Sequence, residues 1–469
     1  MMGSASRTTA HRPKLDDTFR PGYGMLVPAL GIALLLALVW LHATHEELYI
    51  RLLAYWMDQP LRDPFRDLED VLYSITCWRQ GIDVYLHTSC NVTGGAFNYS
   101  PLWLRLSFVP TDPTWTPWLG LGLVSVFLLS LGLLPQPRHW GDRALVVLGT
   151  FSCLPVFAIE RGNLDLLMFL LALVAALCLA RGFALRLIGY IVIMIAGLLK
   201  FYPWAALVLL LRERLRIAAV LGFIALVGIA AFAWWYHDEL GRIAIPHGGQ
   251  AGDNWGAIDL PLGIRAGLVP MLAAMGVDES ASATIRDIAA NVAWLLLVTA
   301  SVGCAGVIAA RRDVHAALAA LPPRVHVFLL IGAALVCGCF FAGPNVGYRG
   351  VFLLFVLPCL LGLARISMGT GAARLFRLTA YATLYVLWML LIQRAVAKVF
   401  GGSFYPVRGS AVGYAAWLLR ELLWWWVATV LLAILIRFGL DSPAWRDLLR
   451  LTRAAARQAT SPASRPGPG

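Results

Sequence analysis

Charged residues are scarce in this chain of 469 residues, of which Asp, Glu, Lys and Arg make up only 14%. An ordinary soluble domain carries about 25%. Hydrophobic residues make up 59% and fall in many long runs. This composition excludes a soluble globular protein and indicates a polytopic membrane protein, in which each crossing needs about 20 apolar residues. The net charge of +12 does not call for nucleic acid as a partner, because cytoplasmic loops concentrate Lys and Arg.

Cysteine is also sparse, and six of the eight cysteines lie inside apolar runs, where a small hydrophobic role is the default. They suggest no metal site, and the acids near His237 and His247 lack a tight ligand spacing. We therefore expect neither a metal nor a cofactor. Cys77 and Cys90 differ because both fall in a long polar segment, so a disulfide between them is a candidate, although spacing alone does not prove a bridge.

Twelve apolar runs are candidate membrane spans, which predicts an all-α bundle of eleven or twelve transmembrane helices. Several runs have only 10 to 16 residues, and the pair on either side of Lys200 is the weakest. The runs cover residues 25–43, 118–134, 144–159, 164–180, 184–199, 202–211, 217–236, 288–310, 325–342, 350–364, 375–393 and 412–437.

Arginines on alternate short loops orient these spans, because loops rich in Lys and Arg stay in the cytoplasm. The pattern predicts a bacterial inner-membrane protein with a cytoplasmic tail (1–24), a membrane domain (25–437) and a first outer loop (44–116). Residues 438–469 read as a basic amphipathic helix on the inner leaflet followed by a disordered end. A solvated helical tail is the alternative for that helix.

The unusual polar residues gather on the predicted outer side. Arg161, Asp165, Lys200 and Arg349 stand at span ends. One such charge alone is usually interfacial, but several on the same face indicate a wet cavity or a functional site. Arg420 and Glu421 lie inside the last apolar run, and we interpret them as structural charges that face the bundle.

The first outer loop is acidic, with Asp63, Asp67, Glu69 and Asp70 within eight residues. At helical spacing Asp67 and Asp70 share a face, and two carboxylates that close raise the pKa of one of them. Such a pair suits a general base. An acidic solvated turn is the alternative.

Several short motifs occur in an order that resembles the polytopic GT-C glycosyltransferases of family 87, which are mannosyl- and arabinofuranosyltransferase-like proteins that use polyprenyl-phosphate sugars. That family has a leading acid in the first outer loop, a Gly-x-x-x-Tyr, an aromatic stretch, a Gly-x-Asn helix start, a Lys-x-x-Pro turn and an Asn-x-x-Tyr-Arg. The matching residues here are Asp67, Gly81 with Tyr85, FNYSPL with Tyr99, RGNLD with Asn163 and Asp165, KFYP with Lys200, and NVGYR with Asn345, Tyr348 and Arg349.

The resemblance implies a GT-C-like fold and inverting transfer of a monosaccharide at the outer face. The donor would be a polyprenyl-phosphate sugar and the acceptor would be a glycolipid or a glycan. Membrane lipids would surround the protein. Asp67 would be the base, although Glu69 and Asp70 compete for that place. Lys200, Arg349, Arg161 and His237 would bind the donor phosphate. Substrate contacts would come from Tyr85, Tyr99, Asn163, Asp165, Asn345 and Tyr348.

Two other functions remain open. A transporter or flippase for lipid-linked sugars would place its charges near the bilayer midplane, on broken helices related by a repeat. A lipid-linked sugar polymerase or ligase would share the architecture and differ only in its substrates. A purely structural subunit is disfavoured by the gathered acids and cations.

Overall fold

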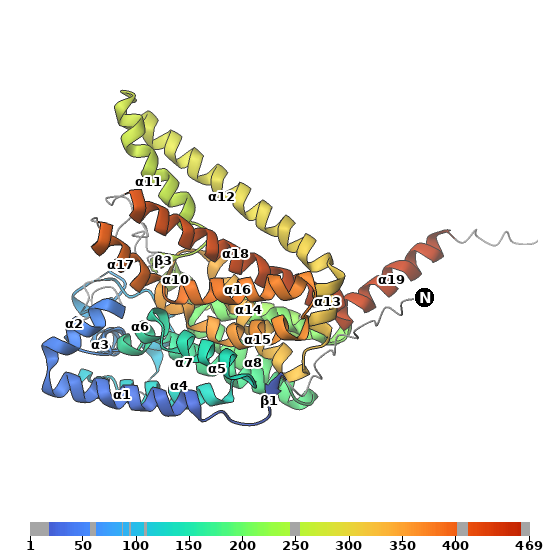
Figure 1. Ribbon diagram of the computed structural model, residues 1–469, viewed down its shortest axis with the longest axis horizontal. Coiled ribbons are helices and arrows are strands. Elements are labelled where there is room, and N and C mark those ends of the chain that lie inside the picture. The colour runs from blue at the N-terminus through green and yellow to red at the C-terminus, as the bar shows by residue number, and fades with distance from the viewer. Residues whose placement is uncertain are drawn as a thin grey trace, which may run out of the picture.

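The computed structural model describes residues 18–56, 62–86, 88–92, 95–106, 110–243, 254–400 and 411–460. Within these residues the protein is helical apart from two short antiparallel pairings (Figure 1). Strand β1 (Phe19–Arg20) pairs with β2 (Gln136–Pro137), and β3 (Asn254–Trp255) pairs with β4 (Asn345–Val346). Most of the predicted tail, His247 and the predicted disordered end lie outside the described residues.

Within the described residues, eight helices are long and apolar enough to cross a membrane, so this is a multi-pass membrane protein. Two of them join an α-helix to short 3₁₀ turns: η4 (Pro113–Trp115), α4 (Thr116–Ser130) and η5 (Leu131–Leu133) form one, and η7 (Gly347–Phe352) and α15 (Leu353–Ile366) form another. The other six are α1 (Leu26–Thr44), α8 (Phe183–Lys200), α9 (Leu215–Trp235), α12 (Glu279–Ala310), α14 (Pro323–Ala342) and α18 (Ala411–Asp441).

Two further spans are bent helix pairs. Helices α5 (Trp140–Thr150) and α6 (Cys153–Arg161) meet at 44°, and α16 (Gly371–Leu387) and α17 (Met389–Phe400) meet at 64°. Counting each pair as one span gives ten, short of the eleven or twelve predicted. The two remaining apolar runs form α7 (Asp165–Leu179) and the 3₁₀ helix η6 (Tyr202–Arg212), each about 22 Å long, which is less than the ~30 Å hydrocarbon core.

Helices also occupy segments that the sequence left as loops. The predicted first outer loop contains α2 (Glu46–Trp56) and α3 (Arg66–Arg79), and α11 (Asp259–Ala274) forms a hairpin with α12 that projects beyond the bundle (Figure 1). The predicted basic helix at the C-terminal end is present as α19 (Pro443–Thr460). The short helices are η2 (Thr88–Cys90), η3 (Trp103–Arg105), α10 (His237–Arg242) and α13 (Arg312–Ala319).

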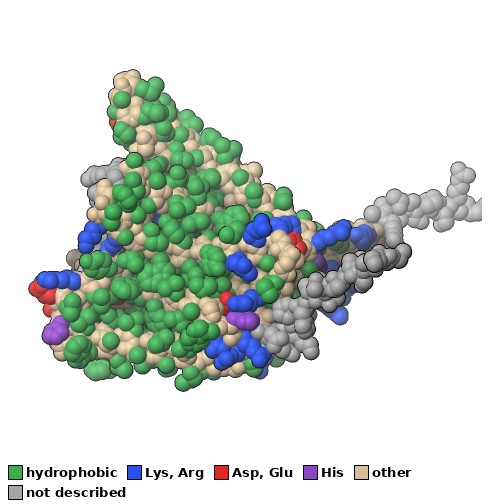
Figure 2. Space-filling view, viewed as in Figure 1, with side chains coloured by type: hydrophobic (Ala, Val, Ile, Leu, Met, Phe, Trp, Pro, Cys, Tyr) green, Lys and Arg blue, Asp and Glu red, His purple; other side chains and the backbone are tan. Residues whose placement is uncertain are grey.

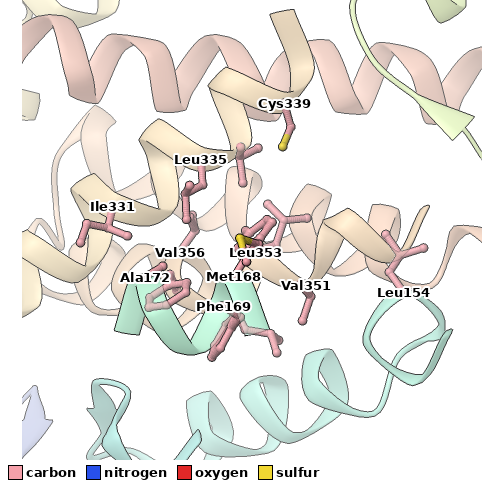
Figure 3. Packing of buried hydrophobic residues seen from close by; sticks show 14 of the residues in the cluster. Leu154, Met168, Phe169, Ala172, Ile331, Leu335, Cys339, Val351, Leu353 and Val356 are labelled. Atoms are coloured by element: carbon pink, nitrogen blue, oxygen red, sulfur yellow. The ribbon is translucent and has the colours of Figure 1, made fainter. Parts of the chain in front are cut away.

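Helices α14 and α15 form the centre of the molecule. They are largely apolar on all sides, as expected of helices that other helices surround, and most of their side chains are buried. Figure 3 shows their side chains converging with those of α7, for example Leu335, Val356 and Phe169. The short helix α7 is thus fixed by packing on the core.

Charged side chains lie at two opposite ends of the molecule, separated by a broad hydrophobic surface (Figure 2). The end near α13, α19 and β1 is strongly basic, and its pairs include Arg186 with Glu213 and Arg365 with Asp142. The other end, around α2 and α3, carries acids, arginines and histidine. Which end faces the cytoplasm remains a prediction from the arginine pattern.

Candidate functional site

Residues from four separate segments form one buried polar cluster. We define the polar cluster as Asp67 of α3, Arg161 of α6, Asn163, Asp165 of α7, Lys200 of α8, Tyr202 of η6 and Arg349 of η7. Every predicted charge at a span end is therefore a member. The cluster lies at the end of the bundle that the sequence assigns to the outside.

Asn163 connects the acid to the cations. Its Nδ2 donates a hydrogen bond to Asp67 Oδ2 at 2.5 Å, and its Oδ1 accepts one from Lys200 Nζ at 3.2 Å. The same Oδ1 accepts from the backbone N–H of Asp165 at 2.8 Å, which holds the amide side chain at the start of α7. Asn163 is fully buried, so its contacts set the distance between Asp67 and Lys200.

Asp165 is the counter-ion of two cations. Lys200 Nζ lies 2.7 Å from its Oδ1 and Arg349 Nε lies 3.7 Å from its Oδ2. Tyr202 also donates its hydroxyl hydrogen to Oδ1. Because the Asp165 side chain is fully buried, these contacts suit a residue that positions the cations; its predicted contact with substrate would require the cluster to open.

Arg349 is held from the other side by Asn345, whose Oδ1 accepts from Arg349 Nη1 at 2.6 Å. The Nδ2 of Asn345 donates to the backbone oxygens of Cys339, Gly343 and Trp255, in the β3–β4 pairing. The predicted substrate residue Asn345 is thus a buried support for the Arg349 guanidinium, which keeps 27% of its side-chain surface exposed.

Arg161 joins the cluster to its neighbour Glu160. Its Nη1 lies 3.9 Å from Asp67 Oδ1, and its Nε lies 3.3 Å from a Glu160 carboxylate oxygen. The guanidinium also lies over the ring of Phe157, 5.4 Å from its centre. One cation is therefore shared between two acids, which suits it to move toward a third negative group.

The backbone around the cluster adopts left-handed conformations. Among the described residues only Phe65 and Phe201 have positive φ angles without being glycine, an uncommon conformation for a bulky residue. Phe65 begins α3 and donates its N–H to Glu160 O at 2.7 Å. Phe201 separates α8 from η6. Both therefore stand within two residues of a cluster member, where such strain is often found in functional sites.

Gly162 brings α3 against α6. Its φ of +55° ends α6 in a left-handed turn, which glycine adopts without a steric cost. A Cβ at this position would lie 2.9 Å from Phe65 Cβ. The absence of a side chain therefore allows Phe65, and with it Asp67, to approach Asn163.

Burial raises the pKa of Asp67 above its ordinary value of 3.8, and the negative charge of Asp70 adds to the rise. The charge of Arg161 and the hydrogen bond from Asn163 oppose it. About 17% of the Asp67 side chain remains exposed. A carboxylate with a raised pKa that a substrate can reach is suited to accept a proton near neutral pH.

The three acids that competed in the sequence have different surroundings. Asp67 faces the cluster, whereas Asp70 Oδ1 accepts from the backbone N–H of Val92 at 2.7 Å and is buried. Glu69 pairs with Arg66 at 2.8 Å. These contacts favour Asp67 as the acid of the site and give Asp70 a role in fixing the segment that follows η2.

Tyrosines cover the cluster on one side. Lys200 Nζ lies 5.1 Å from the ring centre of Tyr99 and 6.0 Å from that of Tyr348. Burial and neighbouring acids raise the pKa of Tyr99 well above its ordinary value, so its hydroxyl stays protonated and can donate. Tyr85 reaches the cluster only through other rings, because it packs on Phe97, which in turn packs on Tyr99.

The predicted phosphate ligand His237 is not brought to the cluster. Its side chain is 73% exposed, and its contacts among the described residues are with Asp238 and the backbone of Trp234. The disulfide considered from the sequence is present between Cys77 and Cys90, and it ties α3 to η2. Within the described part of the chain no three His, Cys, Asp or Glu side chains gather in a manner that could hold a metal ion.

Sequence reasoning named most of the cluster but missed two contributors. The bond from Tyr202 to Asp165 had a weak signal, since Tyr202 lies inside the KFYP motif. The left-handed Phe65 had none, because no local preference predicts that conformation for phenylalanine. Comparison of the chain with models of known families, with curated proteins and with solved structures finds no match.

Proposed function

We propose that this protein is a membrane glycosyltransferase that moves a mannose- or arabinofuranose-like sugar from a polyprenyl phosphate to a glycolipid or cell-envelope glycan, at the outer face of a bacterial plasma membrane. The observation that carries the proposal is the pairing of Asp67 with Lys200 through one asparagine. Asp67 is a reachable acid with a raised pKa, and two further cations lie beside it.

The reaction needs a base for the acceptor hydroxyl and cations for the departing phosphate. As the acceptor oxygen bonds to the anomeric carbon, its proton passes to the Asp67 carboxylate. The bond from that carbon to the phosphate oxygen breaks, and its electron pair leaves with the polyprenyl phosphate. A single direct displacement inverts the anomeric centre.

The Asp67 oxygens are not equivalent in this scheme. Oδ2 accepts the hydrogen bond from Asn163, whereas Oδ1 faces Arg161 at 3.9 Å. We assign the proton transfer to Oδ1, because a bond already accepted at Oδ2 lowers the basicity of that oxygen.

Internal acids neutralise the three cations of the polar cluster while no phosphate is bound. Arg161 pairs with Glu160 and Asp67, and Lys200 and Arg349 both pair with Asp165. A phosphate that enters the cluster would compete with Asp165 for Lys200 and Arg349. In the absence of donor, Asp165 thus keeps both cations in position without leaving a buried charge unpaired.

The test is sugar transfer in membranes from a panel of radiolabelled polyprenyl-phosphate monosaccharides, with an acceptor extract. Asp67→Asn should abolish transfer. The matched control is Glu47→Gln, which removes an acid of the predicted first outer loop that is 81% exposed and pairs with Arg51 of the same helix. Asp70→Asn should act mainly on stability through its bond to Val92.

Loss of transfer in Asp70→Asn but not in Asp67→Asn would reassign the base. No transfer from any donor by well-folded protein would refute the glycosyltransferase and favour the transporter or flippase. Movement of a lipid-linked sugar across vesicles would then be the measurement to make.

A further inference from the structure

A groove runs along α1 and is lined by Phe65 and Glu160, which neighbour the polar cluster in the sequence. It consists of two adjoining cavities between α1, α2, α4 and α6, of about 460 and 310 Å³. Leu38 and Val156 line both cavities, so the two adjoin at these side chains. We call this combined cavity the α1 groove.

The far part of the α1 groove is apolar throughout. The whole α1 groove follows α1 for about 18 Å, from Leu30 to His42 at 1.5 Å per residue. Helix α1 is itself one of the long apolar helices and exposes many hydrophobic side chains. The groove thus opens between helices that face lipid, and its far part is lined by Leu30, Leu34, Leu38, Leu52, Leu53, Trp56, Phe151 and Val156.

The near part of the groove is lined by acids. Asp63, Glu69 and Glu160 all line it, together with His42 and Tyr49. The cations that pair with these acids, Arg66 and Arg161, are not among its lining residues. Asp63 and Glu69 keep 74% and 22% of their side chains exposed, whereas the Glu160 side chain is only 3% exposed. The carboxylates of Asp63 and Glu69 are therefore the ones that an occupant of the near part can reach.

This chemistry selects the head group of the occupant. Carboxylates accept hydrogen bonds from hydroxyl groups, and they repel a phosphate, for which the polar cluster offers three cations. An apolar channel that opens to the bilayer takes a hydrocarbon chain. Phe65 lines the near part and stands two residues before Asp67, so the near part adjoins the segment that carries the acid of the site.

We propose that the α1 groove binds a lipid whose uncharged head group carries hydroxyls, with its chain along α1 and its hydroxyls on the carboxylates of the near part. On the proposed function, on which this role rests, the lipid is the acceptor. Donor and acceptor are then bound by different residues: the phosphate by Lys200 and Arg349, and the hydroxyl by Asp63 and Glu69 in the near part of the groove. The binding itself does not depend on transfer activity.

The experiment measures lipid retention by the purified full-length protein with native mass spectrometry. The probes are a monoglycosyl diacylglycerol, phosphatidylglycerol and a cationic diacyl lipid with the same chains. The wild type should retain the glycosyl lipid in preference to both charged lipids. Leu38→Trp, which fills the junction of the two cavities, should weaken its binding by at least about tenfold.

The matched control is Leu36→Trp, on the same helix but 64% exposed and outside the groove. It should leave retention unchanged. If Leu38→Trp does not fold, Leu34→Phe narrows the far part with a smaller change. Glu69→Gln, which removes one carboxylate from the near part, should increase retention of phosphatidylglycerol relative to the glycosyl lipid.

Equal loss in Leu36→Trp and Leu38→Trp, or equal retention of phosphatidylglycerol by the wild type, would overturn the assignment. Preference for the cationic lipid would overturn the choice of head group. Because retention is read without a donor, glycosyl-lipid binding with no sugar transfer would refute the proposed function alone, and transfer with no binding in the groove would refute this inference alone.

Discussion

Two groups of buried charged side chains in this molecule differ in their exposure to solvent. The polar cluster draws on several distant segments, and Asp67 and Arg349 keep 17% and 27% of their side chains exposed. Arg420 and Glu421 are neighbours on α18, bond to each other and are fully buried. Arg420 also donates to Gln393 of α17 at 3.3 Å.

The comparison teaches that burial of charge alone does not mark a site. The Arg420–Glu421 pair is formed by adjacent residues and is fully buried, which fits the structural role expected from the sequence. The polar cluster is open at its acid and at one cation, and its backbone includes the left-handed Phe65 and Phe201 nearby. Solvent exposure of the charged groups and backbone strain beside them together distinguish a candidate site from a buried structural ion pair.

The largest expected difference between the two groups is the effect of a substitution on the rate of sugar transfer. Asp67→Asn should lower sugar transfer by about 10²- to 10⁴-fold, the usual contribution of a general base. Its melting temperature should not fall, because asparagine has the same shape and still accepts from Asn163. Transfer assays and thermal unfolding in detergent check both. Retained transfer with lowered stability would make Asp67 a structural acid like Glu421.

The opposite result is expected at α18. Glu421→Gln leaves Arg420 as a buried charge without its acid, which should cost about 3–5 kcal/mol of stability. Transfer per folded molecule should stay near wild type. The control is the double variant Arg420→Leu with Glu421→Leu, which removes both charges and should recover most of the loss. A loss of transfer at full stability would place the pair in the site.

A smaller effect is expected where the backbone supports the cluster. Gly162→Ala should cost about 1–2 kcal/mol, because its φ of +55° is unfavourable for alanine. The new Cβ also pushes on Phe65, so transfer should fall as Asp67 moves from Asn163. Gly182→Ala is the control, since its φ is negative and its Cβ would meet nothing within 4 Å. Equal effects of the two changes would contradict this account.

The smallest effect is a shift in pH dependence. Transfer requires Asp67 without its proton, so the rate should rise with pH and reach half its maximum above pH 3.8, since burial raises the pKa of this carboxyl. Arg161→Gln removes a charge that lowers the pKa, and the half-maximum should move further up. Glu47→Gln should leave it in place. A downward shift in Arg161→Gln would exclude Asp67 as the titrating base.

Most of the helical layout was predictable from sequence because each apolar run is a local property. The twelve predicted runs correspond to the eight long helices, the two bent pairs, α7 and η6. Whether each run forms a helix long enough to cross the membrane was not predictable in every case. The sequence does not show that η6 adopts 3₁₀ geometry after the left-handed Phe201, or that α7 depends on packing against α14 and α15.

The candidate site was predictable as a set of residues but not as a set of contacts. Asp67, Glu69 and Asp70 lie within one helical turn, where successive side chains point about 100° apart. Only the approach of α6 decides which of them meets Asn163. His237 shows the converse, since it lies on the predicted side of the membrane but remains exposed on α10, away from the cluster.

The amino-acid sequence by itself determined that this chain enters a membrane many times, and which polar residues lie together at one end. Long apolar segments leave water regardless of their partners, and arginines stay where the loops are short. Only the tertiary structure decided that Asn163 joins Asp67 to Lys200 and that an acid-lined groove runs along α1. These contacts link residues that are distant in the chain, and their geometry depends on close packing of helices that no local pattern encodes.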